Sequence, residues 1–375
     1  MAQRIRVGVI FGGQSGEHEV SLVSATSIIH ALDREKYEII PIGIALDGRW
    51  ISSSRALSVL KEKAGLENEP EQFLVPEPNR RALIAAGGVT GESLPIDVVF
   101  PVIHGTYGED GTLQGLLELA NIPYVGAGVL GSAVGMDKIA QKQILQQAGF
   151  PVVKYLTVLS SDHETNPRRV CNAVEKQFPY PVFVKPANTG SSVGISKAHT
   201  RKELRSALEI AAGYDRRLII ERAVPQAREI ECAVLGNDRP ETSVLGEIVP
   251  SNEFYDYEAK YVDGKSRAFI PAPLPKVVTS RIRSLAVRAF LAIDCAGMAR
   301  VDFFVTRRTH RIYLNELNTI PGFTSISMYP KLWEASGISY STLLDRLITL
   351  AIDRHRQKNK LTRIYQPARD WYRQA

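Results

Sequence analysis

The sequence contains few cysteines and no long apolar segment, and both absences narrow the class of protein. Its three cysteines, Cys171, Cys232 and Cys295, are far apart and form no Cys-x-x-Cys pair, so they indicate neither a disulfide framework nor a zinc site. No apolar stretch reaches the roughly 18 residues of a membrane span, and the run at 7–11 is followed by no signal-peptide cleavage site. We therefore expect a cytoplasmic protein with no membrane partner.

Most of the chain is also close to electrically neutral. The net charge is +6, but residues 351–375 hold seven basic and two acidic residues and so carry +5 of it. A basic terminal segment of this kind is more often a solvated extension than an arm that binds nucleic acid. We therefore expect no nucleic-acid partner.

The length of 375 residues is too great for one ordinary core and predicts two or three domains. Up to residue 125, strand-like and helical segments alternate, which predicts an α/β fold with a Rossmann-like parallel sheet. Residues 52–95 are less regular and are interpreted as an insertion or a long connection. The predicted units are an N-terminal α/β domain at 1–128, a central domain at 129–223, a C-terminal domain at 224–352 and a basic extension at 353–375.

The pattern also predicts individual elements. Helices are expected at 20–31, 112–120, 136–148, 167–177, 202–212 and 277–293. Strands are expected at 5–11, 37–44, 97–103, 123–125, 152–158, 182–186, 217–221, 229–235 and 244–249.

The most informative stretch predicts a hairpin from residues 298–305 and 311–318, with a polar turn between them. A hairpin centred near Arg308 places residue 300 opposite 316 and residue 302 opposite 314. The two-residue period of a strand then puts four polar side chains on one face: Arg300, Asp302, Glu316 and Asn318.

Two carboxylates and an amide on one strand face suit Mg²⁺, a hard cation that prefers oxygen ligands and often shares its shell with phosphates. The alternative is a solvated face with a surface ion pair. The apolar neighbours Phe303, Phe304, Ile312 and Leu314 favour a hairpin that packs on a core.

The segment from Lys185 to Gly194 predicts a phosphate site, because a lysine at a strand end precedes a loop rich in Gly and Ser whose N–H groups can bind phosphate oxygens. Lys138, at the start of a predicted helix, is a second candidate for phosphate binding. Residues 190–194 also match G-x-S-x-G of serine hydrolases, but that motif requires a strand running directly into a helix.

Other loops carry weaker signals. The Gly-rich loops at 11–20 and 104–115 each follow a strand, so we expect them to meet at one site, with His18 and His104 as hydrogen-bonded loop residues. The strand end at Glu221, with Glu229 beyond it, suits a purine and its ribose. Residues 253–261, rich in aromatic residues, are interpreted as a lid over a charged ligand.

Six motifs taken together resemble the D-alanine–D-alanine ligase family of the ATP-grasp superfamily. They occur in the family's order and span nearly the whole chain: Gly12-Gly-x-Ser-x-Glu17, His104-Gly-x-x-Gly-Glu-Asp-Gly111, Lys185-Pro-x-x-x-Gly-Ser-Ser-x-Gly194, Tyr255-Asp-Tyr-x-x-Lys-Tyr261, Arg300-Val-Asp302 and Glu316-Leu-Asn-Thr-x-Pro-Gly322.

The resemblance implies a three-domain ATP-grasp architecture and a two-step reaction in peptidoglycan precursor synthesis. The carboxylate of one D-alanine attacks the γ-phosphate of ATP to give an acyl phosphate. The amine of a second D-alanine then displaces phosphate. It also implies two Mg²⁺ or Mn²⁺ ions and a homodimer.

The resemblance also implies a role for each matching residue. The metal ligands are Asp302, Glu316 and Asn318, and the phosphate-binding lysines are Lys138, Lys185 and Lys260. The adenine hinge and the ribose contact are Glu221, Arg222, Val224 and Glu229. Arg300 and the N–H of Gly322 stabilise the oxyanion, Glu17 holds the first ammonium, and Ser191 links it to Tyr261. Ser327 and Met328 receive the second substrate.

Two alternatives stay open at this point. Relatives that use D-lactate or D-serine as the second substrate share most of the motifs, although Tyr261 and Met328 resemble the D-alanine enzymes. A nucleotide-binding regulatory module without turnover is the alternative from another class, and the intact set of Arg300, Asp302, Glu316 and Asn318 speaks against it.

Overall fold

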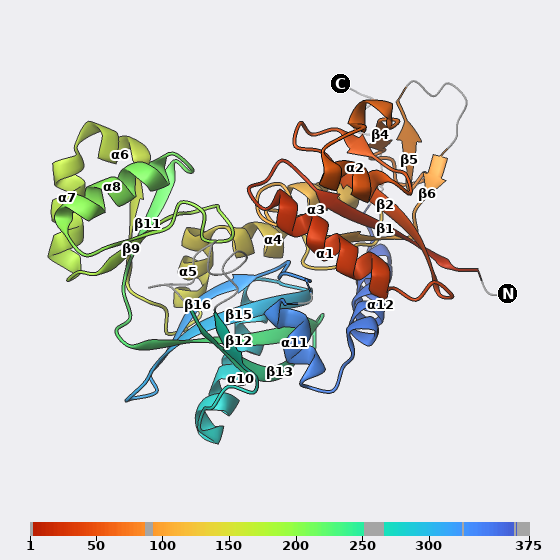
Figure 1. Cartoon of the computed structure of the whole chain (residues 1–375). Coiled ribbons are helices and arrows are strands. Elements are labelled where there is room, and N and C mark those ends of the chain that lie inside the picture. The colour runs from red at the N-terminus through yellow and green to blue at the C-terminus, as the bar shows by residue number, and fades with distance from the viewer. Residues whose placement is uncertain (1–2, 87–92, 251–265, 325, 364, 366–375) are drawn as a thin grey trace.

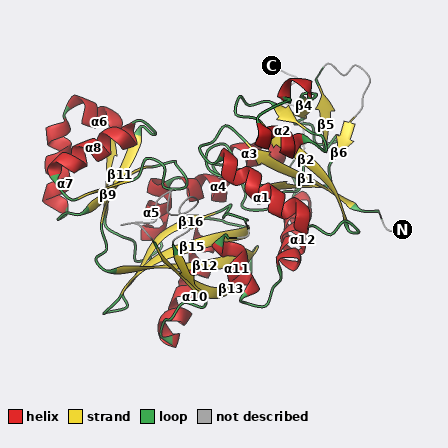
Figure 2. Ribbon diagram, in the orientation of Figure 1, coloured by secondary structure: helices red, strands yellow, loops and turns green. Residues whose placement is uncertain are grey.

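Three groups of elements follow one another along the chain and surround a common centre (Figure 1). The computed structural model describes residues 3–86, 93–250, 266–324, 326–363 and 365. Each group is built on its own sheet, as Figure 2 shows by secondary structure. The mixture of parallel and antiparallel sheets covered by helices confirms the predicted α/β class.

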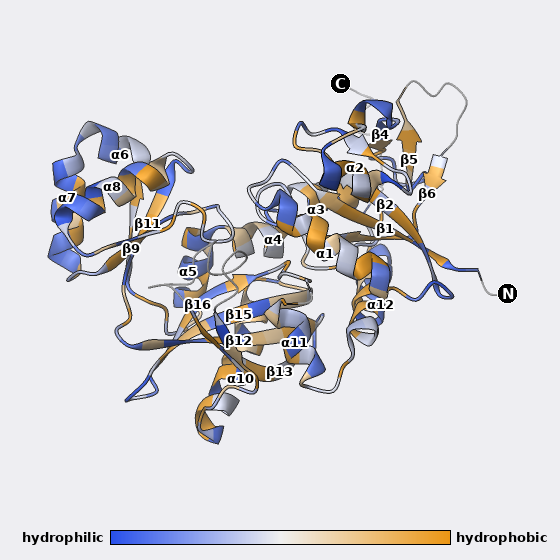
Figure 3. Cartoon of the chain, viewed as in Figure 1, coloured by the Kyte–Doolittle hydropathy of each residue, from blue (hydrophilic) through white to orange (hydrophobic). Residues whose placement is uncertain are grey.

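The N-terminal group contains the parallel sheet predicted from the sequence. Strand β1 pairs in parallel with β2 on one side and with β7 on the other, in the order β3-β2-β1-β7. These strands are mainly hydrophobic (Figure 3), because helices cover the sheet. The elements are β1 (Ile5–Gly12), α1 (His18–Ala31), β2 (Tyr37–Ile44), β3 (Trp50–Ile51), β7 (Val98–Pro101) and α3 (Thr112–Leu119).

The irregular segment at 52–95 forms structure of its own. Its strands β4, β5 and β6 make a small antiparallel sheet beside the N-terminal group. The elements are α2 (Ala56–Glu62), a 3₁₀ helix (Leu66–Asn68), β4 (Gln72–Leu74), β5 (Ala82–Ala85) and β6 (Ser93–Pro95). Strands of three or four residues are too short to give a clear periodicity, which explains why the sequence did not predict them.

Two helices lead into the central group where one was expected at 136–148. They are α4 (Val129–Met136) and α5 (Lys138–Gln147). Asp137 separates them, because its extended backbone ends α4 while its carboxylate accepts the N–H groups of Ile139 and Ala140 at the start of α5.

The central group is an antiparallel sheet in the order β10-β9-β11-β8, with α6, α7 and α8 packed together beside it (Figure 1). The chain after Ser191 continues into strand β10, so the helix that a serine-hydrolase elbow requires is absent here. The elements are β8 (Tyr155–Leu159), α6 (Ser160–Thr165), α7 (Pro167–Gln177), β9 (Val182–Pro186), β10 (Ser196–Ala198), α8 (Arg201–Ala212) and β11 (Arg217–Arg222).

The C-terminal group has a five-stranded sheet in the order β14-β13-β12-β15-β16. Helices α10 and α11 pack against β12 and β13. The elements are β12 (Ala227–Gly236), β13 (Glu241–Val249), β14 (Arg267–Phe269), α10 (Lys276–Ala292), β15 (Gly297–Thr306), β16 (Ile312–Asn318), α11 (Met328–Glu334) and α12 (Tyr340–Asn359).

The predicted hairpin of β15 and β16 forms, but its expected register was wrong by two residues. Arg300 lies opposite Asn318 and Asp302 opposite Glu316, and a bulge then shifts the pairing, so that Phe303 lies opposite Leu314. One residue of this offset arises in the turn, and the second arises at the bulge at Asn315. Because the total offset of two residues is even, the side chains predicted for one face still share a face.

The last helix, α12, runs through the expected boundary at residue 352 and returns to the N-terminal group (Figure 1). Arg354 donates to the carbonyls of Tyr124 and Gly126, and Lys358 pairs with Glu118. The reading of this region as a solvated extension therefore fails for residues 353–355, which are partly buried, whereas residues 356–363 are exposed. None of the helices described, α12 included, is both long and apolar enough to cross a bilayer.

Candidate functional site

Two cavities adjoin at the face of the β15–β16 hairpin. The first, of about 340 Å³, lies between the central sheet and the C-terminal sheet and is lined by Lys185, Glu221 and Glu316 among others. The second, of about 300 Å³, is lined by the N-terminal Glu17 and by Ser327. Arg300 and Glu231 line both cavities, so ligands in the two would meet at the hairpin.

The four side chains predicted to share the hairpin face do so. The Arg300 guanidinium donates to both Asp302 oxygens, at 2.8 and 2.7 Å, and lies 3.3 Å from Glu231. The Asn318 amide donates to Asp302 at 2.9 Å. The carboxylates around it hold the pKa of Arg300 well above its usual value, against the effect of burial. A solvated face with a surface ion pair is thus not what forms.

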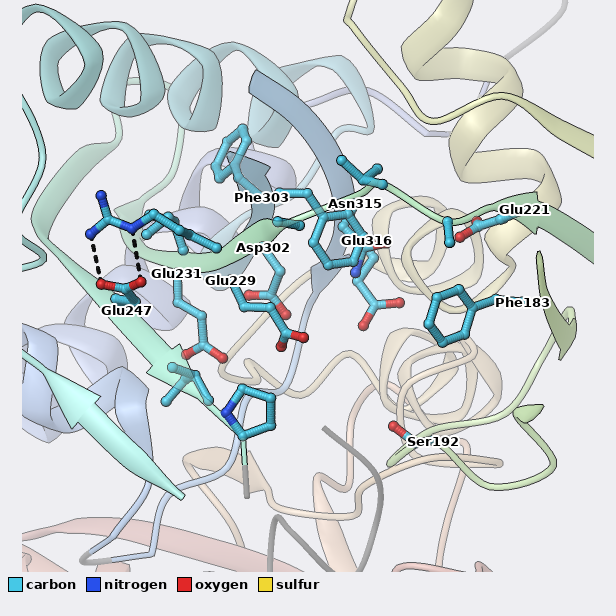
Figure 4. Close-up of a pocket in the computed structure, with 18 of the residues that line it drawn as sticks. Phe183, Ser192, Glu221, Glu229, Glu231, Glu247, Asp302, Phe303, Asn315 and Glu316 are labelled. Carbon is cyan, nitrogen blue, oxygen red and sulfur yellow. Dashed lines mark hydrogen bonds and ion pairs between the residues drawn. The ribbon is translucent and has the colours of Figure 1, made fainter. Parts of the chain in front are cut away.

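The donor set fits a hard divalent cation. Figure 4 shows the side chains of Asp302, Glu316 and Glu229 extending into the same space. Within the described ranges, no group of three or more His, Cys, Asp or Glu residues is arranged around a common metal position. A cation bound here would therefore take two carboxylates, Asp302 and Glu316, and the Asn318 amide as its protein ligands, with further positions open to phosphate oxygens and water.

A buried cluster of opposite charges closes the far end of the first cavity. Glu221 at the end of β11 forms ion pairs with Lys142 at 3.0 Å and with Lys185 at 2.7 Å, and all three side chains are almost completely buried. The two ammonium groups outweigh burial and lower the pKa of Glu221 to about 2. Lys185, predicted as a phosphate-binding lysine at a strand end, lies in β9 and lines the first cavity. Lys142 was not predicted, because one lysine on a helix gives no signal.

The loop after β9 connects the central group to the N-terminal group. The Ser191 hydroxyl donates to Glu17, and the Lys138 ammonium donates to the Thr189 carbonyl at 2.5 Å. A smaller space is lined by Lys138, Ser191, Glu316 and Asn318. Predicted residues from helix α5, from the loop after β9 and from the end of β16 thus line one space.

The two Gly-rich loops of the N-terminal group meet as expected. Ser15 donates to the carbonyl of His104 at 2.6 Å. His104 is a hydrogen-bonded loop residue, as predicted: Nδ1 lies 3.1 Å from the Ile320 carbonyl and Nε2 lies 3.0 Å from the Ser24 hydroxyl. Burial lowers the pKa of His104, so the ring is neutral, donates from Nδ1 and accepts at Nε2.

Glu109 is a member of the site that the sequence reasoning did not single out. Its two oxygens accept the N–H groups of Gly105 and Ile320 at 2.8 and 3.0 Å, which joins the N-terminal loop to the end of the hairpin. Burial, and then the charge of Glu17, raise the pKa of Glu109 to about 8. The only feature of the sequence that could have marked Glu109 as a site residue was its place in the motif that begins at His104.

The segment after β16 forms one wall of the second cavity. Gly322, Ser327 and Met328 all line it, together with Arg300. A Cβ on Gly322 would lie 2.7 Å from the Ser327 hydroxyl oxygen, so a larger residue at 322 would have to displace that hydroxyl. Ser327 in turn holds the turn closed, because its hydroxyl oxygen accepts the Thr324 N–H at 3.0 Å.

Most of the residues predicted for the site therefore line one of these spaces. Arg222 and Val224, expected at an adenine hinge, line the first cavity together with Glu229. The predicted lid, with Tyr255, Lys260 and Tyr261, lies outside the described residues.

The sheets and the two adjoining cavities define an enzyme of the ATP-grasp class, in which a nucleotide site between two sheets opens onto a second substrate site. Family models match the sequence over most of its length: "D-ala D-ala ligase N-terminus" over residues 6–127 and "D-ala D-ala ligase C-terminus" over residues 144–349. The chain belongs to the D-alanine–D-alanine ligase family.

Individual relatives agree with this assignment. The D-alanine–D-alanine ligase of Natranaerobius thermophilus is 50% identical over 96% of this chain and 98% of its own. The solved structure of the D-alanine–D-alanine ligase from Coxiella burnetii matches with a TM-score of 0.81 at 40% identity, covering 96% of this chain and 97% of that one. The VanG D-Ala:D-Ser ligase from Enterococcus faecalis matches with a TM-score of 0.82 at 37% identity, over 93% and 100%.

Proposed function

We propose that the chain joins two molecules of D-alanine to D-alanyl-D-alanine, with ATP converted to ADP and phosphate through an acyl phosphate. One observation carries the proposal: Arg300 lies between a cavity with the lysines and carboxylates of a nucleotide site and a cavity that ends at Ser327 and Glu17. Family membership supports the same substrates. The cytoplasmic location and the homodimer expected from the sequence remain part of the proposal.

In the first cavity, ATP would lie between the central and C-terminal sheets, with its adenine near Glu221, Arg222 and Val224. Lys138, Lys185 and Lys260 would neutralise phosphate charge. Asp302, Glu316 and Asn318 would hold Mg²⁺, which when bound offsets the negative charge of the transferring phosphoryl group. We propose that the units 1–128, 129–223 and 224–352 act as three domains around this site.

In the second cavity, the carboxylate of Glu17 would hold the ammonium of the first D-alanine, and its hydrogen bond from Ser191 would fix its orientation. Arg300 and the N–H of Gly322 would stabilise the oxyanion that develops when the second amine attacks. Ser327 and Met328 would receive the carboxylate end of the second substrate, and Tyr261 would close the lid.

A second candidate, the joining of D-alanine to D-serine, is supported by the similarity to the D-Ala:D-Ser ligase, whose name gives D-serine as the second substrate. Differences in one small side chain change pocket affinities by about 1–3 kcal/mol, so the second substrate depends on few residues. Met328 at the pocket wall favours D-alanine, because an apolar thioether offers no strong partner for a hydroxyl group.

The test is phosphate release from Mg-ATP with D-alanine, with L-alanine, and with D-alanine plus D-lactate or D-serine, together with identification of the product. We expect release and a dipeptide with D-alanine alone, and no release with L-alanine. A mixed product in preference to the dipeptide would favour the second candidate. A protein that binds ATP but releases no phosphate with any of these substrates would be the regulatory module instead.

A further inference from the structure

The outer edge of strand β16 is completed by side chains instead of by another strand. β16 is the last strand of the C-terminal sheet, so the backbone groups of alternate residues face away from β15. At Leu314 this edge is covered by main chain, because its N–H donates to the carbonyl of Pro151 at 2.8 Å. Beyond that point helix α5 lies beside the strand, and buried backbone groups there need other partners.

Gln141 of α5 supplies the hydrogen-bond partners for the outward-facing backbone groups of Leu317. Its carboxamide oxygen accepts the Leu317 N–H at 3.0 Å, and its amide nitrogen donates to the Leu317 carbonyl at 3.2 Å. This is the pair of bonds that a residue of a neighbouring strand would make. The same amide group donates to the carbonyl of Gly135 at 2.7 Å, so the side chain, only 1% exposed, is held in place.

Lys142, the next residue of α5, makes the matching contact at Asn315. Its ammonium donates to the Asn315 carbonyl at 3.0 Å. Asn315 is the extra residue of the bulge, where the pairing with β15 shifts. The two neighbours of Glu316 are therefore each fixed by a side chain of α5.

We infer that Gln141 is a positioning residue, which fixes the backbone of β16 beside the bulge so that the Glu316 carboxylate faces Asp302. The inference deepens the proposed function and rests on it. A bulge redirects the side chains next to it, and a slip of one residue moves a side chain to the other face of the sheet. Groups that orient a metal ligand in this way commonly change metal affinity by about 10- to 100-fold when they are removed.

Gln141 tests this idea more directly than Lys142 does. Lys142 also pairs with Glu221 at 3.0 Å, so its loss would disturb the nucleotide cavity by a second route. The hydrogen bonds of the Gln141 side chain all go to backbone groups of Gly135 and Leu317. Gln141→Met keeps the length of the side chain and removes these bonds.

The experiment measures binding of a non-hydrolysable ATP analogue by titration calorimetry at increasing Mg²⁺, without D-alanine, for the full chain. For Gln141→Met we expect the Mg²⁺ concentration that gives half-maximal binding to rise about tenfold. The matched control is Leu285→Ala, a cavity in the core beneath the same sheet, which should lower thermal stability and leave the Mg²⁺ dependence unchanged. If Gln141→Met does not fold, Gln141→Glu replaces it, because it loses the donor to the Leu317 carbonyl and should shift Mg²⁺ dependence in the same direction.

The outcomes separate the two proposals. A Gln141 variant with the Mg²⁺ dependence of the wild type, even if less stable, overturns the inference and leaves the proposed function standing. An equal shift in Leu285→Ala also overturns it, because general loosening would then explain the effect. Wild-type protein that binds the analogue independently of Mg²⁺ would instead overturn the metal site of the proposed function.

Discussion

Glu316 and Asp302 are at the centre of the chemistry proposed for this chain, and they differ in how they are held. Asp302 is fixed by Arg300 and Asn318 within the hairpin. Glu316 has its side chain in the first cavity while its two neighbours are fixed from α5. Removing the charge of Glu316 therefore changes the site while the backbone contacts of Asn315 and Leu317 stay in place.

From this difference, Glu316→Gln is expected to lower kcat by at least about 100-fold while the protein stays folded. The amide has nearly the same shape but is neutral and so binds a divalent cation poorly. Steady-state phosphate release, with circular dichroism and thermal unfolding as checks of the fold, measures both. Activity near that of the wild type in a folded variant would remove Glu316 from the metal site.

The buried Glu109 predicts a pH dependence of stability. In the folded protein its pKa is raised to about 8 by burial and by Glu17, above the ordinary value of 4.5 that the unfolded chain would show. The folded state thus binds more protons, so the contribution of this group is fully present below about pH 4.5 and is lost as the pH rises through about 8.

We therefore expect the unfolding temperature of the ligand-free protein to fall from about pH 5 to about pH 9 by more in the wild type than in Glu109→Gln, which cannot ionise. Scanning calorimetry across this range gives both curves. The variant should be less stable at low pH, because its amide nitrogen would face a backbone N–H. Parallel curves would show that Glu109 does not titrate in this window.

At the scale of elements, the hairpin shows what sequence patterns can and cannot predict. Alternation of polar and apolar residues was enough to place Arg300, Asp302, Glu316 and Asn318 on one face. The register was not predictable, because the bulge at Asn315 is stabilised by Lys142, more than 170 residues away in sequence. Local patterns carry no information on such a contact, and for the same reason Gln141 and Lys142 were missed.

Helix α12 gives the second case at this scale. Its composition is basic, and charge alone suggested a solvated segment. In the structure Arg354 packs 4.5 Å from the centre of the Tyr124 ring and donates to the carbonyls of Tyr124 and Gly126. His355 lies 2.9 Å from the Asn121 carbonyl. The same charged residues thus join the C-terminal helix to the N-terminal sheet, which only the tertiary structure reveals.

Arg354→Ala is accordingly expected to lower the free energy of unfolding by about 1–3 kcal/mol, through the loss of a cation–π contact and two hydrogen bonds from a charged group. Arg356→Ala is the matched control two residues away, because its side chain is 72% exposed and pairs with Asp353 on the same helix. It should change stability by less than about 0.5 kcal/mol. Denaturant unfolding measures both, and equal effects would argue against the anchoring role of Arg354.

At the scale of the whole molecule, the site exists only when the three groups of elements approach one another. The loop after β9 brings Ser191 from the central group to Glu17 of the N-terminal group, and Glu109 joins the N-terminal loop to the hairpin. The family resemblance implied the link between Glu17 and Ser191, but the sequence did not single out Glu109. Their convergence is a property of the assembled chain, because no single group contains both a nucleotide cavity and Glu17.

Gly190 is the point at which this convergence can be tested. A Cβ at this position would overlap the Glu17 carboxylate, which is buried and so has little room to move. Gly190→Ala should therefore hold the loop away from Glu17 and lower kcat/KM for D-alanine by about 100-fold, as a displacement of about 1 Å at a reacting centre can do. Binding of an ATP analogue should be affected much less, because Lys185 and Glu221 lie on β9 and β11 and pair with each other outside this loop.

The matched control is Gly115→Ala in α3, where an added Cβ meets no atom within 4 Å. It should leave the kinetics unchanged and raise stability slightly, because alanine is favoured over glycine inside a helix by up to about 1 kcal/mol. Steady-state kinetics with D-alanine and calorimetric titration with the ATP analogue separate the two effects. A Gly190→Ala enzyme with the kcat/KM of the wild type would mean that turnover does not need the central loop to approach Glu17. The N-terminal group would then bind the first substrate on its own, and the contact between Ser191 and Glu17 would be a consequence of closure instead of a requirement for it.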